Sequence, residues 1–188
     1  MTIIKKLKHL NQVLIYDPQV DQMSVLLEGI DQDVEVIALD EQANSVEKIN
    51  EILLRPELQR LDILAHGEPG AVLLGGQRLD SLSWPSQISA SHSSNRETPL
   101  QINFWSCRTG EGETGMKFIN TVAQTSNAFV NAASGFVGHS ELGGSWDLDV
   151  SAKPVAPFSK LSLANFHAVL DEPVNNPPVD GDDTPSAA

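Results

Sequence analysis

The chain has 188 residues, 40% of them hydrophobic, so it is long enough for one globular domain with a buried core. Its formal net charge of −13 argues against nucleic-acid binding, which requires Lys and Arg to neutralise phosphates. No run of about 18 apolar residues is present, and the apolar stretch near the N-terminus is too short for an ordinary signal peptide. We therefore expect no membrane insertion.

The first part of the chain alternates between expected strands and helices. Val20, Met23 and Leu26 follow helical spacing, and Ser45 is a suitable N-cap for a later helix. In chain order we expect a strand over 13–16, a helix over 20–30, a strand over 34–39, a helix over 45–54 and a strand over 61–65. Strands that alternate with helices predict βαβ units and a parallel sheet.

The next part begins with an expected hairpin, because the segments 71–74 and 77–79 flank Gly75-Gly76, which suits a two-residue turn. There follow an expected helix over 82–90, a polar loop over 91–99, a strand over 100–106, a helix over 114–126, a strand over 129–133 and a half-exposed edge strand over 146–150. The predicted fold class is α/β: a three-layer α/β/α sandwich with a mostly parallel sheet and an added hairpin. Residues 12–170 form the domain, and 171–188 are an acidic, Pro-rich linker that cannot fold alone.

Two expected strands end in residues that carry chemistry. His66 follows the strand over 61–65, and Cys107 follows the strand over 100–106. Because the carboxyl ends of parallel strands meet at one edge of a sheet, the two side chains are expected to be neighbours there. A thiol paired with an imidazole is a typical nucleophile–base arrangement. We predict a Cys107 sulfur within about 3–5 Å of a His66 ring nitrogen and a thiol that is reactive near neutral pH.

Other interpretations of these residues remain open. Cys107 is the only cysteine, which excludes an internal disulfide, and a lone cysteine is often a small buried hydrophobe. His66 is also consistent with a core imidazole, and His139 is the competing histidine. The segment 110–115 matches G-x-G-x-x-G, but its two glutamates would repel a pyrophosphate. No zinc-ligand or P-loop spacing is present, so we expect no metal and no cofactor, and a small-ligand binding domain is the weakest alternative.

The segments 63–67 and 104–110 resemble the two catalytic strand ends of caspase-like cysteine peptidases. A closer resemblance is to the DUF4347 domain, found near the amino termini of large bacterial surface proteins. The matching segments are 15–17, 34–36, 66–71, 74–75 and 143–148, in the same order. The chain departs from that family's usual pattern at Ala65 and at Arg108. Residues 175–184 are similar to the opening of cadherin-like or VCBS repeats, which implies a piece of a secreted or cell-surface protein.

The resemblance implies a cysteine endopeptidase with a polypeptide substrate. Cys107 would be the nucleophile, His66 the general acid/base, and the backbone N–H groups of Gly67 and Cys107 the oxyanion hole. Asp17 is a candidate for recognising a basic side chain, although capping of its own loop is an equal alternative. Asp147 is a weaker substrate-binding candidate.

The rival interpretation is a non-catalytic anchoring or partner-binding module of an adhesin. If the domain is a peptidase, its own tethered chain is its nearest substrate, because tethering gives an effective concentration of about millimolar. With Asp17 shaping the pocket, we expect cleavage after Arg or Lys, with Arg96 and Lys160 as the accessible positions.

Overall fold

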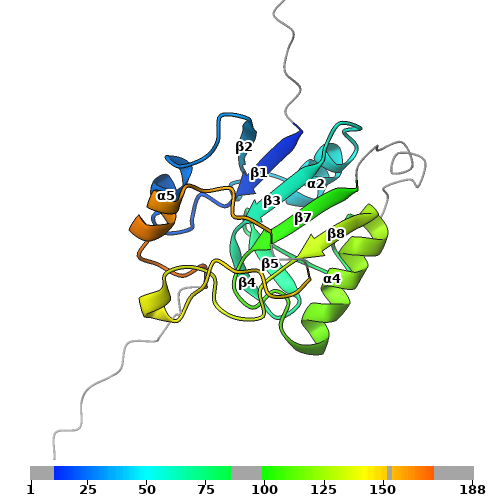
Figure 1. The fold of residues 1–188 in the computed structure, drawn as a ribbon. Helices are drawn as coiled ribbons and strands as arrows, with labels where there is room; N and C mark the ends of the chain where they lie inside the picture. The colour runs from blue at the N-terminus through cyan, green and yellow to red at the C-terminus, as the bar shows by residue number, and fades with distance from the viewer. Residues whose placement is uncertain (1–10, 86–98, 152–153, 172–188) are drawn as a thin grey trace, which may run out of the picture.

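A five-stranded sheet forms the centre of the molecule in the computed structural model, which describes residues 11–85, 99–151 and 154–171. The strand order is β2-β1-β3-β7-β8, and every pair is parallel (Figure 1). The strands are β1 (Gln12–Tyr16), β2 (Val34–Ala38), β3 (Arg60–Leu64), β7 (Leu100–Trp105) and β8 (Ala128–Asn131). The predicted α/β class with a mostly parallel sheet is confirmed.

A smaller antiparallel sheet follows β3 directly. It consists of β4 (His66–Glu68), β5 (Ala71–Leu74) and β6 (Gln77–Asp80). Leu74 pairs with Gln77 across the turn, and Gly75 and Gly76 have φ angles of 57° and 68°. Glycine tolerates this left-handed backbone, which a two-residue hairpin turn with the right twist requires. The hairpin is as predicted, whereas the short strand β4 was not expected.

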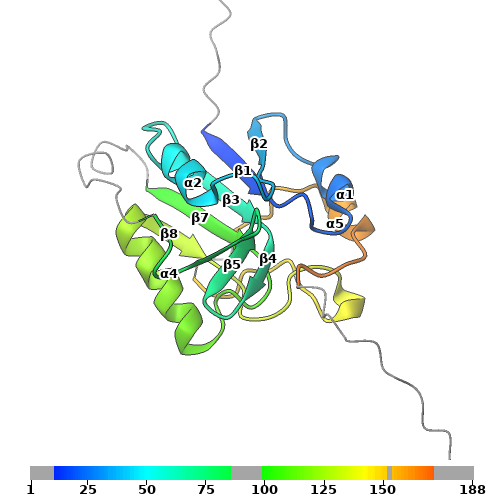
Figure 2. The same cartoon turned by 180° about the vertical axis from the view of Figure 1, so that it is seen from behind.

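One face of the large sheet is covered by α2 (Ser45–Leu53), α4 (Gly112–Ser126) and the β5–β6 hairpin, as Figure 2 shows. The helices present apolar residues at helical spacing, and these pack against the inward residues of β1, β3 and β7. The largest fully buried members of this core are Ile15, Ile49, Ile52, Leu53, Leu58, Leu61, Phe104 and Phe118.

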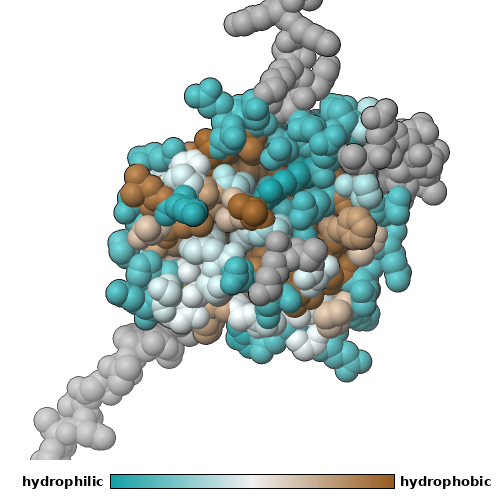
Figure 3. All heavy atoms as spheres, viewed as in Figure 1, coloured by the Kyte–Doolittle hydropathy of each residue, from teal (hydrophilic) through white to brown (hydrophobic). Residues whose placement is uncertain are grey.

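The other face is covered by α1 (Met23–Leu27), α5 (Lys160–Asn165) and the connections after β8, which include the short 3-10 helix η1 (Ser140–Leu142). Its core contains Leu14, Leu26, Leu64, Trp105, Cys107, Val137, Leu148, Phe158, Phe166 and Leu170. Figure 3 shows this face as scattered apolar groups among hydrophilic ones. Helices therefore lie on both faces of the sheet, as a three-layer arrangement requires.

A buried polar ladder crosses three neighbouring strands. The fully buried carboxylate of Asp62 on β3 accepts hydrogen bonds from Asn103 Nδ2 at 2.8 Å and from Trp105 Nε1 at 2.7 Å. It also forms an ion pair with Arg60 Nε at 2.6 Å. Asn131 Nδ2 on β8 in turn donates to Asn103 Oδ1 at 2.8 Å. These bonds satisfy a charge that would be costly to bury alone, and they fix the register of β3, β7 and β8.

Several element boundaries differ from the sequence prediction. The helix expected over 20–30 is limited to α1, because Gln22 takes a left-handed φ of 56°. Asn44, not Ser45, caps α2, and its side chain accepts the N–H of Glu47 at 3.2 Å. The helix expected over 114–126 begins two residues earlier, at Gly112.

The edge strand expected over 146–150 is absent. In that stretch only Val150 makes a bridge, to Ala132. Residues 82–85 form a turn and an extended residue, not the start of a helix. The rest of the helix expected over 82–90, the polar loop over 91–98 and the tail over 172–188 lie outside the described residues. In the part of the chain that is described, no helix has the length and apolar character needed to span a bilayer.

Candidate functional site

The strands that end at His66 and Cys107 are direct neighbours in the sheet. β3 and β7 pair in parallel up to Leu64 and Trp105, and the N–H of Ala65 donates to the carbonyl of Trp105 at 3.3 Å. The ladder ends there: Cys107 follows β7, and His66 begins β4, where it pairs with Leu73, so both residues follow neighbouring strands at the carboxyl edge of the sheet. The sequence predicted this shared edge, because both residues follow the last residue of a parallel strand.

Gly67 brings the backbone of β4 against the loop that carries Cys107. A Cβ atom at this position would lie 2.5 Å from the carbonyl oxygen of Cys107 and 2.6 Å from Thr109 Oγ1. Only a glycine permits so close an approach, since real Cβ atoms keep more than 3.0 Å from such neighbours. The His66-Gly67 dipeptide and the Cys107 loop are therefore packed as one unit.

The loop after β7 is held by hydrogen bonds on both sides. The hydroxyls of Ser106 and Thr109 share a bond of 2.6 Å, and Thr109 Oγ1 also lies 3.2 Å from the carbonyl oxygen of Ala71 on β5. Arg108 has a left-handed φ of 60°, which is uncommon for a residue other than glycine, and its N–H donates to the carbonyl of Gly135 at 2.8 Å. Backbone strain of this kind persists only where surrounding contacts enforce it, and it is frequent at functional sites.

The thiol of Cys107 is fully buried on the α5 side of the sheet. Its sulfur accepts the N–H of Val137 at 3.2 Å, and the thiol donates to the carbonyl of the same residue at 3.7 Å. Burial, with a smaller contribution from the negative charge of Asp171, raises the pKa of Cys107 to about 12. The thiolate expected near neutral pH is therefore not the form present in this closed arrangement, because burial outweighs the hydrogen bonds that favour it.

His66 begins β4 and is half-buried. Its Nδ1 atom is shielded from solvent and has no hydrogen-bond partner among the residues that the structure describes. A buried ring nitrogen usually finds such a partner. The separation of about 3–5 Å between a ring nitrogen and the Cys107 sulfur stays a prediction.

The segment 168–170 lies over the Cys107 loop as a short antiparallel partner of 137–139. The N–H of His139 donates to the carbonyl of Ala168 at 2.9 Å, and the N–H of Leu170 donates to the carbonyl of Val137 at 2.8 Å. Gly138 and Val169 form the antiparallel bridge between these two bonds. The backbone N–H of Cys107 donates to the carbonyl oxygen of Leu170 at 3.4 Å. This segment thus covers the thiol and occupies one of the two predicted oxyanion-hole donors.

Asp17 is buried at the end of β1, and both of its carboxylate oxygens accept backbone hydrogen bonds. Oδ1 accepts from the N–H of Gln19 at 2.9 Å, and Oδ2 accepts from the N–H of Gly75 at 2.9 Å. These bonds fit the second predicted role of Asp17, capping of its own loop, and not recognition of a basic side chain. Asp147 is exposed, and its backbone N–H donates to Ser145 Oγ at 3.1 Å.

Three further residues were candidates from the sequence. The ring of His139, the competing histidine, packs on that of His167 with centroids 4.6 Å apart, and its Nδ1 accepts the N–H of Glu141. Lys160 is exposed at the first turn of α5, and Arg96 lies outside the described residues.

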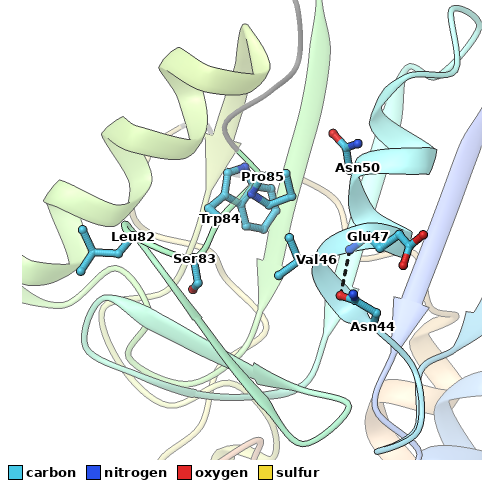
Figure 4. Close-up of a pocket in the computed structure, with 8 residues that line it drawn as sticks. All are labelled: Asn44, Val46, Glu47, Asn50, Leu82, Ser83, Trp84 and Pro85. Carbon is cyan, nitrogen blue, oxygen red and sulfur yellow. Dashed lines mark hydrogen bonds between the residues drawn. The ribbon is translucent and has the colours of Figure 1, made fainter.

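A separate pocket of about 440 Å³ opens between the start of α2 and the turn after β6 (Figure 4). Its lining residues are Asn44, Val46, Glu47, Asn50, Leu82, Ser83, Trp84 and Pro85. The one hydroxyl nucleophile in this lining is Ser83, whose Oγ is hydrogen-bonded to Arg78 O and to Asp80. The pocket contains neither His66 nor Cys107, so the predicted chemistry lies elsewhere.

Val137 and Leu170 were not found from the sequence, although both contact the Cys107 loop. An apolar run, Ala168 to Leu170, directly precedes the polar tail, and this run was the only available signal. It indicates burial but not the partner. No group of three or more His, Cys, Asp or Glu side chains that would hold a metal ion is found within residues 11–85, 99–151 and 154–171.

The chain is thus an α/β domain with a five-stranded parallel sheet, in which a histidine and a cysteine follow two neighbouring strands. The family model described as "Domain of unknown function (DUF4347)" matches residues 13–170, and the chain belongs to that family. A search of the curated proteins found no match.

Proposed function

We propose that this domain is a cysteine endopeptidase in which Cys107 is the nucleophile and His66 is the general acid/base. The observation that carries the proposal is the parallel pairing of β3 with β7, after which His66 and Cys107 follow at the same edge of the sheet. The buried Nδ1 of His66, which has no hydrogen-bond partner among the described residues, supports it. The likeness of both strand ends to those of caspase-like peptidases supports the same assignment. Peptide-bond cleavage needs a nucleophile, a proton carrier and donors for the developing oxyanion.

The oxyanion donors of this proposal are the backbone N–H groups of Cys107 and Gly67. The N–H of Cys107 already donates to a peptide carbonyl, that of Leu170. Gly67 packs within van der Waals contact of the Cys107 carbonyl, so its backbone is held close to the same loop. Loss of one such donor typically lowers kcat by about 10²–10³.

One observation favours the alternative, a non-catalytic module of a surface protein. Cys107 is fully buried among apolar side chains, and burial raises its pKa to about 12, as expected for a structural thiol. In the peptidase interpretation the same burial reflects a site closed by segment 168–170. The two interpretations differ in what happens when that segment is loosened.

The test measures hydrolysis of internally quenched peptides by the full chain and by the full chain carrying Leu170→Gly. The Gly variant removes a side chain that is fully buried over Cys107 and so loosens the cover. Each protein is also prepared with Cys107→Ala, with His66→Ala, or with Phe129→Ala, a matched control at an exposed position on β8. Circular dichroism verifies that every variant is folded.

If the domain is a peptidase, the chain with Leu170→Gly hydrolyses the peptides, whether or not the wild-type chain does. Adding Cys107→Ala abolishes this hydrolysis, adding His66→Ala lowers its rate about 10²-fold or more, and adding Phe129→Ala leaves it unchanged. Absence of Cys107-dependent hydrolysis in both backgrounds would reject the peptidase and leave the non-catalytic module. Hydrolysis that survives Cys107→Ala would identify a contaminating protease and would reject the proposal equally.

A further inference from the structure

We propose that segment 168–171 is the domain's own substrate, and that Cys107 cleaves the peptide bond between Leu170 and Asp171. This inference rests on the proposed peptidase function and names the bond on which it acts. Three independent features of the segment support it: where its carbonyl points, how its backbone is paired, and where the Leu170 side chain sits.

The carbonyl of Leu170 points at the backbone N–H of the nucleophile itself. The Cys107 N–H to Leu170 oxygen distance is 3.4 Å, longer than an ideal bond but within the range of ground-state contacts that tighten as charge develops. An attacked carbonyl needs this kind of donor on its oxygen. No other carbonyl among the described residues accepts the Cys107 N–H.

The backbone pairing holds the same peptide beside the thiol. The carbonyl of Val137 accepts both the Leu170 N–H, at 2.8 Å, and the Cys107 thiol, at 3.7 Å. The sulfur and the Leu170 peptide therefore converge on one oxygen atom. The additional bond from His139 N–H to Ala168 O and the bridge between Gly138 and Val169 hold the segment as far as a bend at Leu170 and Asp171. Peptides bound by strand addition are held in this way.

The Leu170 side chain lies in an apolar environment. It is fully buried in the same cluster as Leu14, Leu64, Trp105 and Phe166. A charged Arg or Lys would be desolvated among these apolar side chains. The geometry therefore favours an apolar residue before the cleaved bond, in place of the Arg or Lys expected from the sequence.

The proposed cleavage needs only groups of the chain itself and one water molecule. The Cys107 sulfur forms a bond to the carbonyl carbon of Leu170, and the bond from that carbon to the Asp171 nitrogen breaks. The thiol proton passes through His66 to the leaving amine, which departs as the new N-terminus at Asp171. Water then hydrolyses the thioester, giving the Leu170 carboxylate and the free thiol.

Because the thiol is protonated in the closed state, the reaction is expected to be slow. The charged groups that act on the thiol are Asp171, which disfavours the thiolate, and Arg108, which favours it. In the proposed step His66, the first residue of β4, accepts the proton as the bond forms. One event per chain is sufficient for a self-processing domain.

The test follows the full 188-residue chain over time by intact mass spectrometry, with fragment termini sequenced. The matched variants are Asp171→Pro and Asp171→Asn. The Pro variant turns the cleaved bond into a tertiary amide that most peptidases do not hydrolyse, and it leaves the Leu170 side chain and N–H in place. The Asn variant changes the charge at the same position and keeps an ordinary amide.

The proposal predicts a fragment ending at Leu170 from the wild-type chain and from Asp171→Asn, and intact chain from Asp171→Pro and Cys107→Ala. Cleavage at another bond, or equal cleavage of Asp171→Pro and Asp171→Asn, would overturn it. An uncleaved wild-type chain would also overturn it. The peptidase itself would still stand if quenched peptides are hydrolysed in a manner dependent on Cys107 and His66.

Discussion

Replacement of Gly67 by alanine tests whether the His66 strand and the Cys107 loop pack as one unit. The added Cβ would meet Cys107 O at 2.5 Å, Thr109 Oγ1 at 2.6 Å and Ser106 Cβ at 2.8 Å. None of these atoms is the end of a flexible side chain free to turn away. The first is backbone, and the hydroxyls of Ser106 and Thr109 are bonded to each other. The loop itself must therefore move.

Overpacking of a rigid buried site costs about 1–3 kcal/mol. We expect Gly67→Ala to lower the free energy of unfolding by that amount, measured by urea denaturation followed by circular dichroism. For a domain of this size each kcal/mol corresponds to about 2–4 °C in Tm. Moving the loop also shifts the Cys107 N–H from the Leu170 carbonyl, so cleavage at Leu170 should slow about 10²-fold or more, the effect of losing one oxyanion donor.

Gly135→Ala is the matched control, because a Cβ at Gly135 would meet nothing within 4 Å and its φ is not left-handed. Its stability should be unchanged or higher by about 0.4–1 kcal/mol, through reduced freedom of the unfolded chain. Equal stabilities for Gly67→Ala and Gly135→Ala would refute the close packing of Gly67 against the Cys107 loop.

The buried ladder and the buried thiol give further predictions. Asn103→Leu should lower the free energy of unfolding by about 2–4 kcal/mol, because the Asp62 carboxylate loses a donor and the Asn131 amide loses an acceptor. Gln101→Leu on the same strand should change it far less, and equal losses in urea titrations would contradict the ladder's role. The Cys107 pKa of about 12 in the folded chain exceeds the unfolded value of about 8.5, so its contribution to stability is complete below pH 8.5 and lost as pH rises towards 12. Wild type should therefore lose up to about 1.4 kcal/mol per pH unit in that window relative to Cys107→Ala, and parallel pH curves would show that the thiol is not buried. Asp171→Asn should speed alkylation of Cys107 by iodoacetamide, since it removes a charge that raises the thiol pKa; an unchanged or slower rate would argue against that influence.

The parallel sheet was predictable because its strands are short apolar runs separated by helical spacing and by turn residues. Asn44 was missed as a cap because Asn44 and Ser45 are both good N-caps, and only the three-dimensional position of Glu47 decides between them. Residues 146–150 alternate as a strand should, but of these only Val150 pairs, through an isolated bridge to Ala132 just after β8. Alternation predicts an extended segment and says nothing about its partner.

That His66 and Cys107 both follow strands at the carboxyl edge of the sheet was predictable from the order of the strands alone. The environment of the thiol was not, because it is created by Val137 and Leu170, which lie 30 and 63 residues after Cys107 in the sequence. Nothing local in the sequence pairs these segments. The role of Asp17 was likewise ambiguous until the hairpin turn at Gly75 was found against its carboxylate.

Covalent labelling of Cys107 tests the central assignment most directly. The full chain carrying Leu170→Gly is treated with a peptidyl acyloxymethyl ketone bearing leucine next to the reactive group, and the adduct is mapped by mass spectrometry. The same protein with His66→Ala is compared, and iodoacetamide serves as a reagent that needs no bound peptide. The account predicts an adduct on Cys107 that forms about 10²-fold or more slowly without His66, with a much smaller change for iodoacetamide. Equal ketone labelling with and without His66 would contradict the pairing of His66 with Cys107 as a catalytic dyad.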